Sequence, residues 1–148
     1  MRLNLIKTII TMEIFKETLH KEGLRYTSQR QEIWNELRSS DEHRDAEEIY
    51  FALRKRGLRI SRATVYRTID VLVKNNLLDK LDIGDGRARF EYNEKCLHHD
   101  HLVCTKCGKI VEFYNDEIEE LQNKIAKQHN FMLLDNSHQL FGICKDCQ

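Results

Sequence analysis

The 148-residue sequence contains no proline, no low-complexity stretch and no apolar run long enough to cross a membrane. A bilayer-spanning helix needs about 20 consecutive apolar residues. The apolar run from Leu3 to Ile10 is shorter, is interrupted by Lys7 and has no small-residue cleavage site behind it. Membrane spanning and export are therefore poor interpretations. With 32% charged and 41% apolar residues, disorder is equally poor, and we expect a globular chain.

The sequence also lacks the usual signatures of a catalyst. It has no phosphate-binding loop, no His-Glu-x-x-His helix and no recognisable nucleophile next to a base. A metal-dependent hydrolase or oxygenase is therefore a remote alternative, and we expect that the protein is not an enzyme.

The net charge of the whole chain is zero, but the two halves differ in sign. Residues 1–90 contain 18 Lys and Arg against 14 Asp and Glu, whereas residues 91–148 contain 6 against 10. A basic first half suits binding to nucleic acid, and an acidic second half suits binding to cations. The signal is weak, because ordinary solvated surfaces also mix charges.

The first half has the apolar spacing of helices followed by a hairpin. Three helical runs are expected before residue 57 and a fourth after Ser61. Asp45 and Glu48 form a capping pair for the third run. Residues 77–83 and 87–92 then predict two strands around a tight Asp-Gly turn. This order predicts a winged helix. The inward apolar positions of the first three runs are Ile14, Leu19, Leu24, Ile33, Trp34, Leu37, Ala46, Ile49, Tyr50 and Leu53.

From residue 98 the pattern changes to short strands and one helix. Strands are expected over residues 101–103, 110–114 and 138–143. Residues 117–129 predict an amphipathic helix between them, with Ile118, Leu121 and Ile125 on its inner face. The second half is therefore expected to be a small α/β unit.

Two Cys-x-x-Cys pairs provide the strongest chemical signal. Cys104 with Cys107 and Cys144 with Cys147 offer four thiolates to one tetrahedral zinc ion at about 2.3 Å. Two disulfides or free core thiols are the alternatives, and disulfides do not suit a chain in a reducing compartment. We expect a structural zinc ion with no vacant position for catalysis. A zinc ribbon that only binds other proteins would leave the winged helix unexplained.

Four consecutive metal-binding side chains, His98-His99-Asp100-His101, precede the first cysteine pair. Side chains alternate along a strand, so His99 and His101 would face one way and His98 and Asp100 the other. Imidazole and carboxylate without thiolate suit iron(II), manganese(II), cobalt(II) or zinc. A solvated polar strand edge is the alternative interpretation.

The sequence contains four motifs in this order: Ala63-Thr64-Val65-Tyr66-Arg67-Thr68, His98-His99-Asp100-His101, Cys104-x-x-Cys107-Gly108-Lys109 and Phe141-Gly142-Ile143-Cys144. Together they resemble the ferric uptake regulator family, in the family's order and over about residues 13–147. The resemblance implies an α+β chain in the cytoplasm: a winged helix-turn-helix DNA-binding domain over residues 1–92, then a small zinc-stapled α/β dimerisation domain over residues 93–148. Residues 1–12 are an extension without an assigned function.

Such regulators are homodimers, with a tetramer left open here, that close onto an A·T-rich operator when a divalent metal binds. The family's regulatory ligands correspond to His43 and Glu91 in the first half and to His99, His101 and Glu112 in the second. One ion held by both halves would fix the angle between them. Peroxide-sensing relatives carry aspartates at the two glutamate positions, and zinc-sensing relatives usually lack the full histidine strip. The resemblance therefore implies an iron(II)-responsive repressor, with zinc or peroxide/manganese sensing as the alternative.

A second family metal site resembles His98, Asp100 and Glu119. Its fourth ligand, a histidine, is replaced by Asn136, and His138 follows two residues later. A shift of two residues along a strand keeps the face but moves a side chain by ~7 Å. We expect this second site, with His138 as the substitute ligand, to be weakened, rebuilt or absent.

The fourth helix would enter the major groove of DNA, with Arg62, Thr64, Tyr66 and Arg67 near its start. By resemblance, Tyr66 contacts thymine methyl groups, Arg67 binds phosphate and Arg25 reaches the minor groove. Without the resemblance, these side chains would be interpreted as core and solvated surface.

One departure from the family is Cys96, which lies in a segment that is one residue longer than in well-known members. A loop thiol is the favoured interpretation. A fifth metal ligand or a redox-sensitive cysteine would need a lowered pKa, which the sequence does not show.

Overall fold

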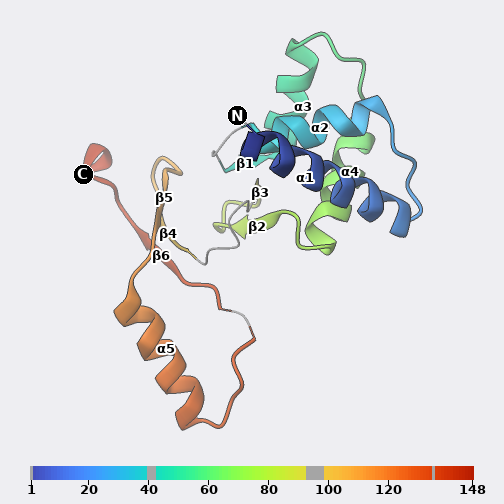
Figure 1. Ribbon diagram of the computed structural model, residues 1–148. Helices are drawn as coiled ribbons and strands as arrows, with labels where there is room; N and C mark the ends of the chain where they lie inside the picture. The colour runs from blue at the N-terminus through green and yellow to red at the C-terminus, as the bar shows by residue number, and fades with distance from the viewer. Residues whose placement is uncertain (1, 40–42, 93–98, 135) are drawn as a thin grey trace. The chain divides into compact units, whose positions relative to one another are not determined.

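The structure, a computed structural model, describes residues 2–39, 43–92, 99–134 and 136–148, with side chains described from residue 12 onward. The predictions for Cys96 and His98 therefore lie outside the described residues. The chain divides into two compact units, residues 1–95 and 96–148, and each is described by itself (Figure 1).

The first unit begins with four helices: α1 (Arg2–Lys21), α2 (Ser28–Arg38), α3 (Ala46–Lys55) and α4 (Arg62–Lys74). Local capping explains where three of them begin. The side chains of Thr27 and Ser61 accept hydrogen bonds from backbone N–H groups at the starts of α2 and α4. Asp45 and Glu48 form a reciprocal capping box on α3, as predicted. Each cap satisfies N–H groups that have no partner within the helix.

The core of the first unit lies among these helices. Phe15 stacks on Trp34 with ring centroids 5.1 Å apart and an interplanar angle of 1°. Ile14 was expected on the inner face, but it is 41% exposed and Phe15 takes its place. The helical period was correct and Leu19 is buried as expected, but Phe15 rather than Ile14 lies on the buried side of α1. Other buried side chains include Leu19, Ile33, Leu37, Ile49, Leu53, Val65, Ile69 and Leu72.

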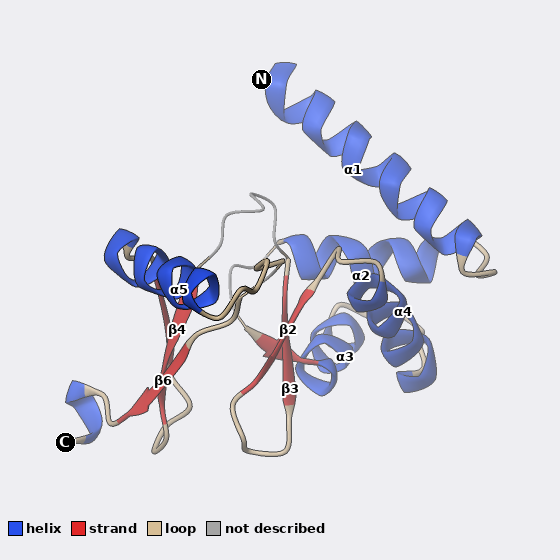
Figure 2. Cartoon of the chain, turned by 90° about the horizontal axis from the view of Figure 1, so that it is seen from below, coloured by secondary structure: helices blue, strands red, loops and turns tan. Residues whose placement is uncertain are grey.

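A three-stranded antiparallel sheet completes the first unit, with order β1-β3-β2. Its strands are β1 (Arg44–Asp45), β2 (Asp79–Asp82) and β3 (Ala88–Glu91). The predicted hairpin is present, and Gly84 and Gly86 in its turn have φ of 80° and 78°, a left-handed conformation that favours glycine. In Figure 2, α2, α3 and α4 lie together beside β2 and β3. The first unit is therefore a winged helix.

The second unit has a three-stranded sheet with order β5-β4-β6. It consists of β4 (Asp100–Cys104), β5 (Ile110–Phe113) and β6 (Gln139–Gly142), with helix α5 (Asp116–Gln128) between β5 and β6 and a short 3-10 helix, η1 (Lys145–Cys147). The β4/β5 pair is antiparallel and the β4/β6 pair is parallel. Together the two units give an α+β chain.

The apolar stripe of α5 is not an inner face within this unit. Leu121 and Ile125 are 55% and 48% exposed, whereas Ala126 is buried. The prediction of an inner face was therefore wrong for Leu121 and Ile125 in the single chain, whereas Ile118 is half-buried. Figure 1 shows α5 beyond one end of the strands, so its own sheet does not cover it.

None of the described helices is both long and apolar enough to cross a membrane.

Candidate metal and DNA-binding sites

The two cysteine pairs come together in the second unit. Their four sulfur atoms all lie within 4.8 Å of one another, and Cys107 Sγ lies 3.7 Å from Cys144 Sγ. Ligands about 2.3 Å from a tetrahedral ion are about 3.8 Å apart, whereas sulfurs in a disulfide are about 2.05 Å apart. The four cysteines are free, so their arrangement fits one tetrahedral metal ion.

The backbone explains why this site forms. Gly108, at φ 74°, lets the first pair turn tightly, and its N–H donates to the Cys104 carbonyl at 2.9 Å. The parallel pairing of β4 with β6 puts Cys104 opposite Gly142, two residues before Cys144. The Cys144 backbone N–H donates to Cys104 Sγ at 3.3 Å. The fold therefore brings together two sequence-local pairs that lie about 40 residues apart.

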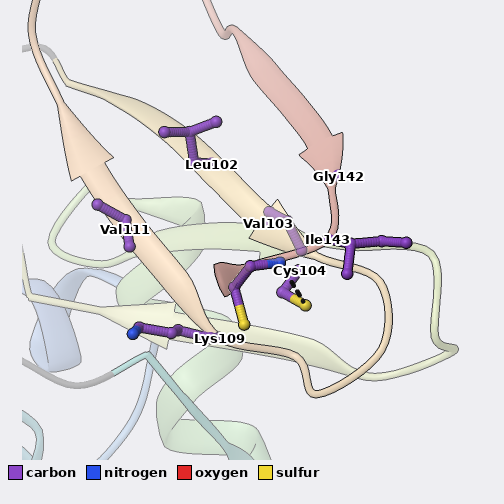
Figure 3. A pocket seen from close by; sticks show the side chains of 8 residues that line it. Leu102, Val103, Cys104, Lys109, Val111, Gly142 and Ile143 are labelled. Atoms are coloured by element: carbon purple, nitrogen blue, oxygen red, sulfur yellow. Dashed lines mark hydrogen bonds between the residues drawn. The ribbon is translucent and has the colours of Figure 1, made fainter. Parts of the chain in front are cut away.

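Hydrogen bonding distinguishes the thiols of this site. The backbone N–H of Cys144, with further backbone donors, lowers the pKa of Cys104 to about 6. Hydrogen bonding with the neighbouring thiols of Cys144 and Cys107 raises the pKa of Cys147 to about 12. Cys104 is thus more readily converted than Cys147 to the thiolate that binds metal. Figure 3 shows it at the end of β4, next to a small hollow whose apolar lining includes Val103 and Ile143.

In the first unit, the structure brings His43 and Glu91 together. His43 Nε2 lies 3.1 Å from Glu91 Oε2, and the side chains are 8% and 13% exposed. Strand β1 explains this contact, because its pairing of Arg44 with Phe90 continues to place His43 opposite Glu91. Strand β1 has only two residues and was not predicted from local sequence patterns.

In the second unit, His99 and His101 lie on the same side of the chain. Their ring centroids are 4.9 Å apart, and His101 pairs across the sheet with Glu112. Asp100, which lies between them, is only 1% exposed. The predicted alternation is confirmed for these three residues.

The residues of the expected second site behave differently. Asp100 Oδ2 lies 3.7 Å from His138 Nδ1. Glu119 instead accepts a hydrogen bond from Asn136 Nδ2 at 3.0 Å, and the same amide group donates to Gln122. Among the described residues, Asp100, Glu119 and His138 do not form a group of three ligand atoms close enough for one metal ion. From the sequence, Asn136 could be predicted as a missing ligand, but not as a hydrogen-bond donor to Glu119.

The predicted DNA-binding residues of α4 lie on its exposed side. Tyr66 is 45% exposed, the Arg62 side chain is 53% exposed, and Arg67 is also exposed. Thr64 lies beside the N-terminal cap of α4, with its hydroxyl oxygen 2.9 Å from that of the capping residue Ser61.

Arg25 is exposed in the loop between α1 and α2. It lines an open hollow together with Lys16, His20 and Lys21. This part of the surface is therefore mainly basic, as a DNA-binding surface requires.

A winged helix joined to a unit with a four-cysteine metal site defines a metal-binding protein of the winged-helix class. Comparison with known proteins identifies the family. Residues 21–141 match the Ferric uptake regulator family, and the chain belongs to that family. It is therefore a metal-responsive transcription regulator rather than an enzyme.

Individual relatives agree with this assignment. The chain is 39% identical over 140 residues to the ferric uptake regulation protein of Campylobacter jejuni, and this match covers 93% of this chain and 88% of the relative. The solved structure of the Helicobacter pylori ferric uptake regulator, described as having three functional metal binding sites, is 34% identical with a TM-score of 0.84 and covers 92% of this chain and 90% of that one. The Francisella tularensis regulator, solved with iron, is 30% identical with a TM-score of 0.78, over 84% of this chain and 95% of that one.

Proposed function

We propose that this protein is a cytoplasmic repressor that binds an A·T-rich operator as a homodimer when iron(II) is available. The observation that carries the proposal is that each unit holds its own set of histidine and carboxylate side chains. His43 and Glu91 form one set, and His99, His101 and Glu112 form the other. These five residues are the proposed regulatory ligands.

The regulatory step follows from which unit each ligand belongs to. An ion held by both sets would restrict the orientation of the first unit relative to the second, and so favour one arrangement of the DNA-binding surfaces. The increase in DNA affinity can be no larger than the preference of the metal for that arrangement. The imidazole and carboxylate ligands suit iron(II), and they also accept manganese(II) or zinc.

We assign a structural zinc ion to Cys104, Cys107, Cys144 and Cys147. Thiolate ligands at tetrahedral spacing are typical of zinc sites without an open position. The ion would tie the end of β6 to the turn after β4 and contribute directly to folding.

The first domain, residues 1–92, is assigned to DNA binding. Tyr66 would face bases, Arg67 phosphate and Arg25 the minor groove. Arg62 would contact DNA beside Tyr66, while Thr64 supports the start of α4. The exposure of α4 and the basic hollow beside Arg25 support this role.

The second domain, residues 93–148, is assigned to dimerisation. Exposed apolar patches commonly mark protein interfaces. Here the exposed apolar side chains include Leu121, Ile125, Phe131, Met132, Leu134, Leu140, Phe141 and Ile143.

A second metal site at His98, Asp100, Glu119 and His138 is proposed only in a weakened form. Asn136 already donates a hydrogen bond to Glu119 Oε2, and a metal ion at that oxygen would compete with this contact. The close approach of Asp100 and His138 supports the part of the site that remains.

DNA binding can be tested with two substitutions on α4. Arg67→Ala should weaken binding to every duplex and reduce its salt dependence, because it removes a phosphate contact. Tyr66→Ala should weaken binding mainly to the A·T-rich inverted repeat, because it removes a base contact. Both would be measured by fluorescence anisotropy on specific and random duplexes. Equal losses on both duplexes for both variants would contradict these roles, and failure of the wild-type protein to prefer any duplex would contradict the proposed function.

A further inference from the structure

Glu47, in the first turn of α3, contacts two of the proposed DNA-binding side chains at once. Arg62 Nε donates to both oxygens of the Glu47 carboxylate, at 2.9 and 3.1 Å. The Tyr66 hydroxyl donates to the same carboxylate at 3.3 Å. A single acidic side chain of α3 therefore connects two residues that lie one turn apart on α4.

The mode of binding leaves part of Arg62 available. Its guanidinium lies over the ring of Tyr50, with 4.4 Å from Cζ to the ring centroid, and 5.5 Å from that of Phe51. Only Nε is used for the contact with Glu47. In the described part of the chain, the two Nη groups make no hydrogen bond. These Nη groups can bind a pair of acceptor atoms on DNA.

Stability alone does not account well for this arrangement. The Arg62 and Glu47 side chains are 53% and 36% exposed, and exposed ion pairs contribute little to folding. The carboxylate also places a negative charge next to a surface that must approach phosphates. Such a charge weakens binding to any DNA, whereas fixing Arg62 and Tyr66 favours only DNA with acceptors in matching positions.

We propose that Glu47 is a positioning residue for DNA recognition, which orients Arg62 and Tyr66 toward the operator and lowers affinity for unrelated DNA. This inference rests on the proposed DNA-binding function. The partner of Arg62 is a pair of acceptors, either the O6 and N7 atoms of a guanine or two phosphate oxygens. In both cases Glu47 acts through Arg62 and does not itself touch DNA.

The test measures the ratio of affinities for the operator and for a random duplex of equal length, at several salt concentrations, with the full-length, metal-loaded protein. Glu47→Ala should raise affinity for the random duplex and reduce the ratio by about tenfold, the discrimination typical of one well-placed arginine. Glu47→Gln, which keeps the shape of the side chain, should reduce the ratio less. It also provides the test if the alanine variant folds poorly.

Asp70→Asn is the matched control. Asp70 lies on α4, is exposed and makes no hydrogen bond or ion pair among the residues that the structure describes. The substitution removes the same charge and should change both affinities alike, leaving the ratio within about twofold. If Asp70→Asn reduces the ratio as much as Glu47→Ala does, only charge is involved and the positioning role is wrong.

A double-substitution cycle tests whether Glu47 acts through Arg62. In an Arg62→Ala background, Glu47→Ala should lose most of its effect on the ratio. An undiminished effect would overturn the proposal. Replacing operator guanines by 7-deazaguanine distinguishes the two acceptor pairs. If Arg62→Ala no longer weakens binding to the modified operator, Arg62 binds a guanine edge. If Arg62→Ala still weakens binding and also lowers its salt dependence, Arg62 binds phosphate. A wild-type protein without operator preference would contradict the proposed function, whereas preference unaffected by Glu47→Ala would contradict only the inference about Glu47.

Discussion

Removal of the metal from the four-cysteine site should unfold the second unit and leave the first folded. Among the described residues, the buried apolar side chains of the second unit are Val103, Cys104 and Ala126. Burial contributes about 1.5–3 kcal/mol for a valine and less for the other two, so these side chains supply less than about 9 kcal/mol. Structural zinc sites contribute an apparent 10–16 kcal/mol or so. The metal is therefore the larger stabilising contribution in this unit.

The assay is hydrogen exchange followed by mass spectrometry, before and after chelation. Protection of β4, β5 and β6 should fall to that of an unfolded chain. Protection of α2, α3 and α4 should persist, because Trp34, Ile49 and Leu53 belong to a separate buried core. Cys107→Ser should have the same effect as the chelator, whereas Cys96→Ser, which is outside the predicted zinc site, should have none. Undiminished protection of β4 after complete zinc removal would refute this reasoning.

Three further predictions concern the core, an ion pair and the second site. Leu53→Ala should lower the free energy of unfolding by about 2–5 kcal/mol, as truncation of a fully buried leucine does; a loss below about 1 kcal/mol in chemical denaturation would contradict the assigned core. Burial raises the pKa of Glu36, but hydrogen bonds from Arg44 and Arg56 outweigh it and lower the pKa overall. The stabilisation from Glu36 is therefore present above the unfolded pKa of about 4.3 and is lost as pH falls through the folded pKa. Glu36→Gln should therefore lower Tm more at pH 7 than at pH 3. An equal decrease in Tm at both pH values would contradict the ion pair. Asn136→His should increase the manganese(II) bound per chain in equilibrium dialysis; no increase would show that the missing histidine is not what weakens the second site.

Features determined by nearby residues could be predicted from the sequence. The capping box of Asp45 and Glu48, the helix start after Ser61 and the Asp-Gly hairpin all depend on residues within a few positions of one another. The two cysteine pairs could be predicted for the same reason, since each pair is local and the chemistry of zinc requires four ligands.

Features that depend on distant residues could not be predicted. Strand β1 has two residues and exists because Arg44 pairs with Phe90. The contact between His43 and Glu91 depends on that pairing, so only the family resemblance could name His43 as a ligand. Glu47 contacts α4 across 15 residues of sequence, and no local pattern indicates such a contact.

The apolar stripe on α5 shows a different limit. Its period correctly predicted a helix, but the period does not say what covers the stripe. Leu121 and Ile125 are exposed within the single chain, which a second copy of the second unit would explain.

The most direct test of the account is a metal titration of DNA binding with one ligand removed from each unit. Zinc-loaded protein would be titrated anaerobically with iron(II) and then manganese(II) in the presence of an A·T-rich inverted repeat, and binding followed by fluorescence anisotropy at fixed salt. Affinity should rise steeply with iron(II), and His43→Ala and His101→Ala should each abolish the rise while leaving metal-free binding unchanged. If tight binding is indifferent to added metal, or if only one of the two substitutions has an effect, a regulatory ion shared by both units is contradicted.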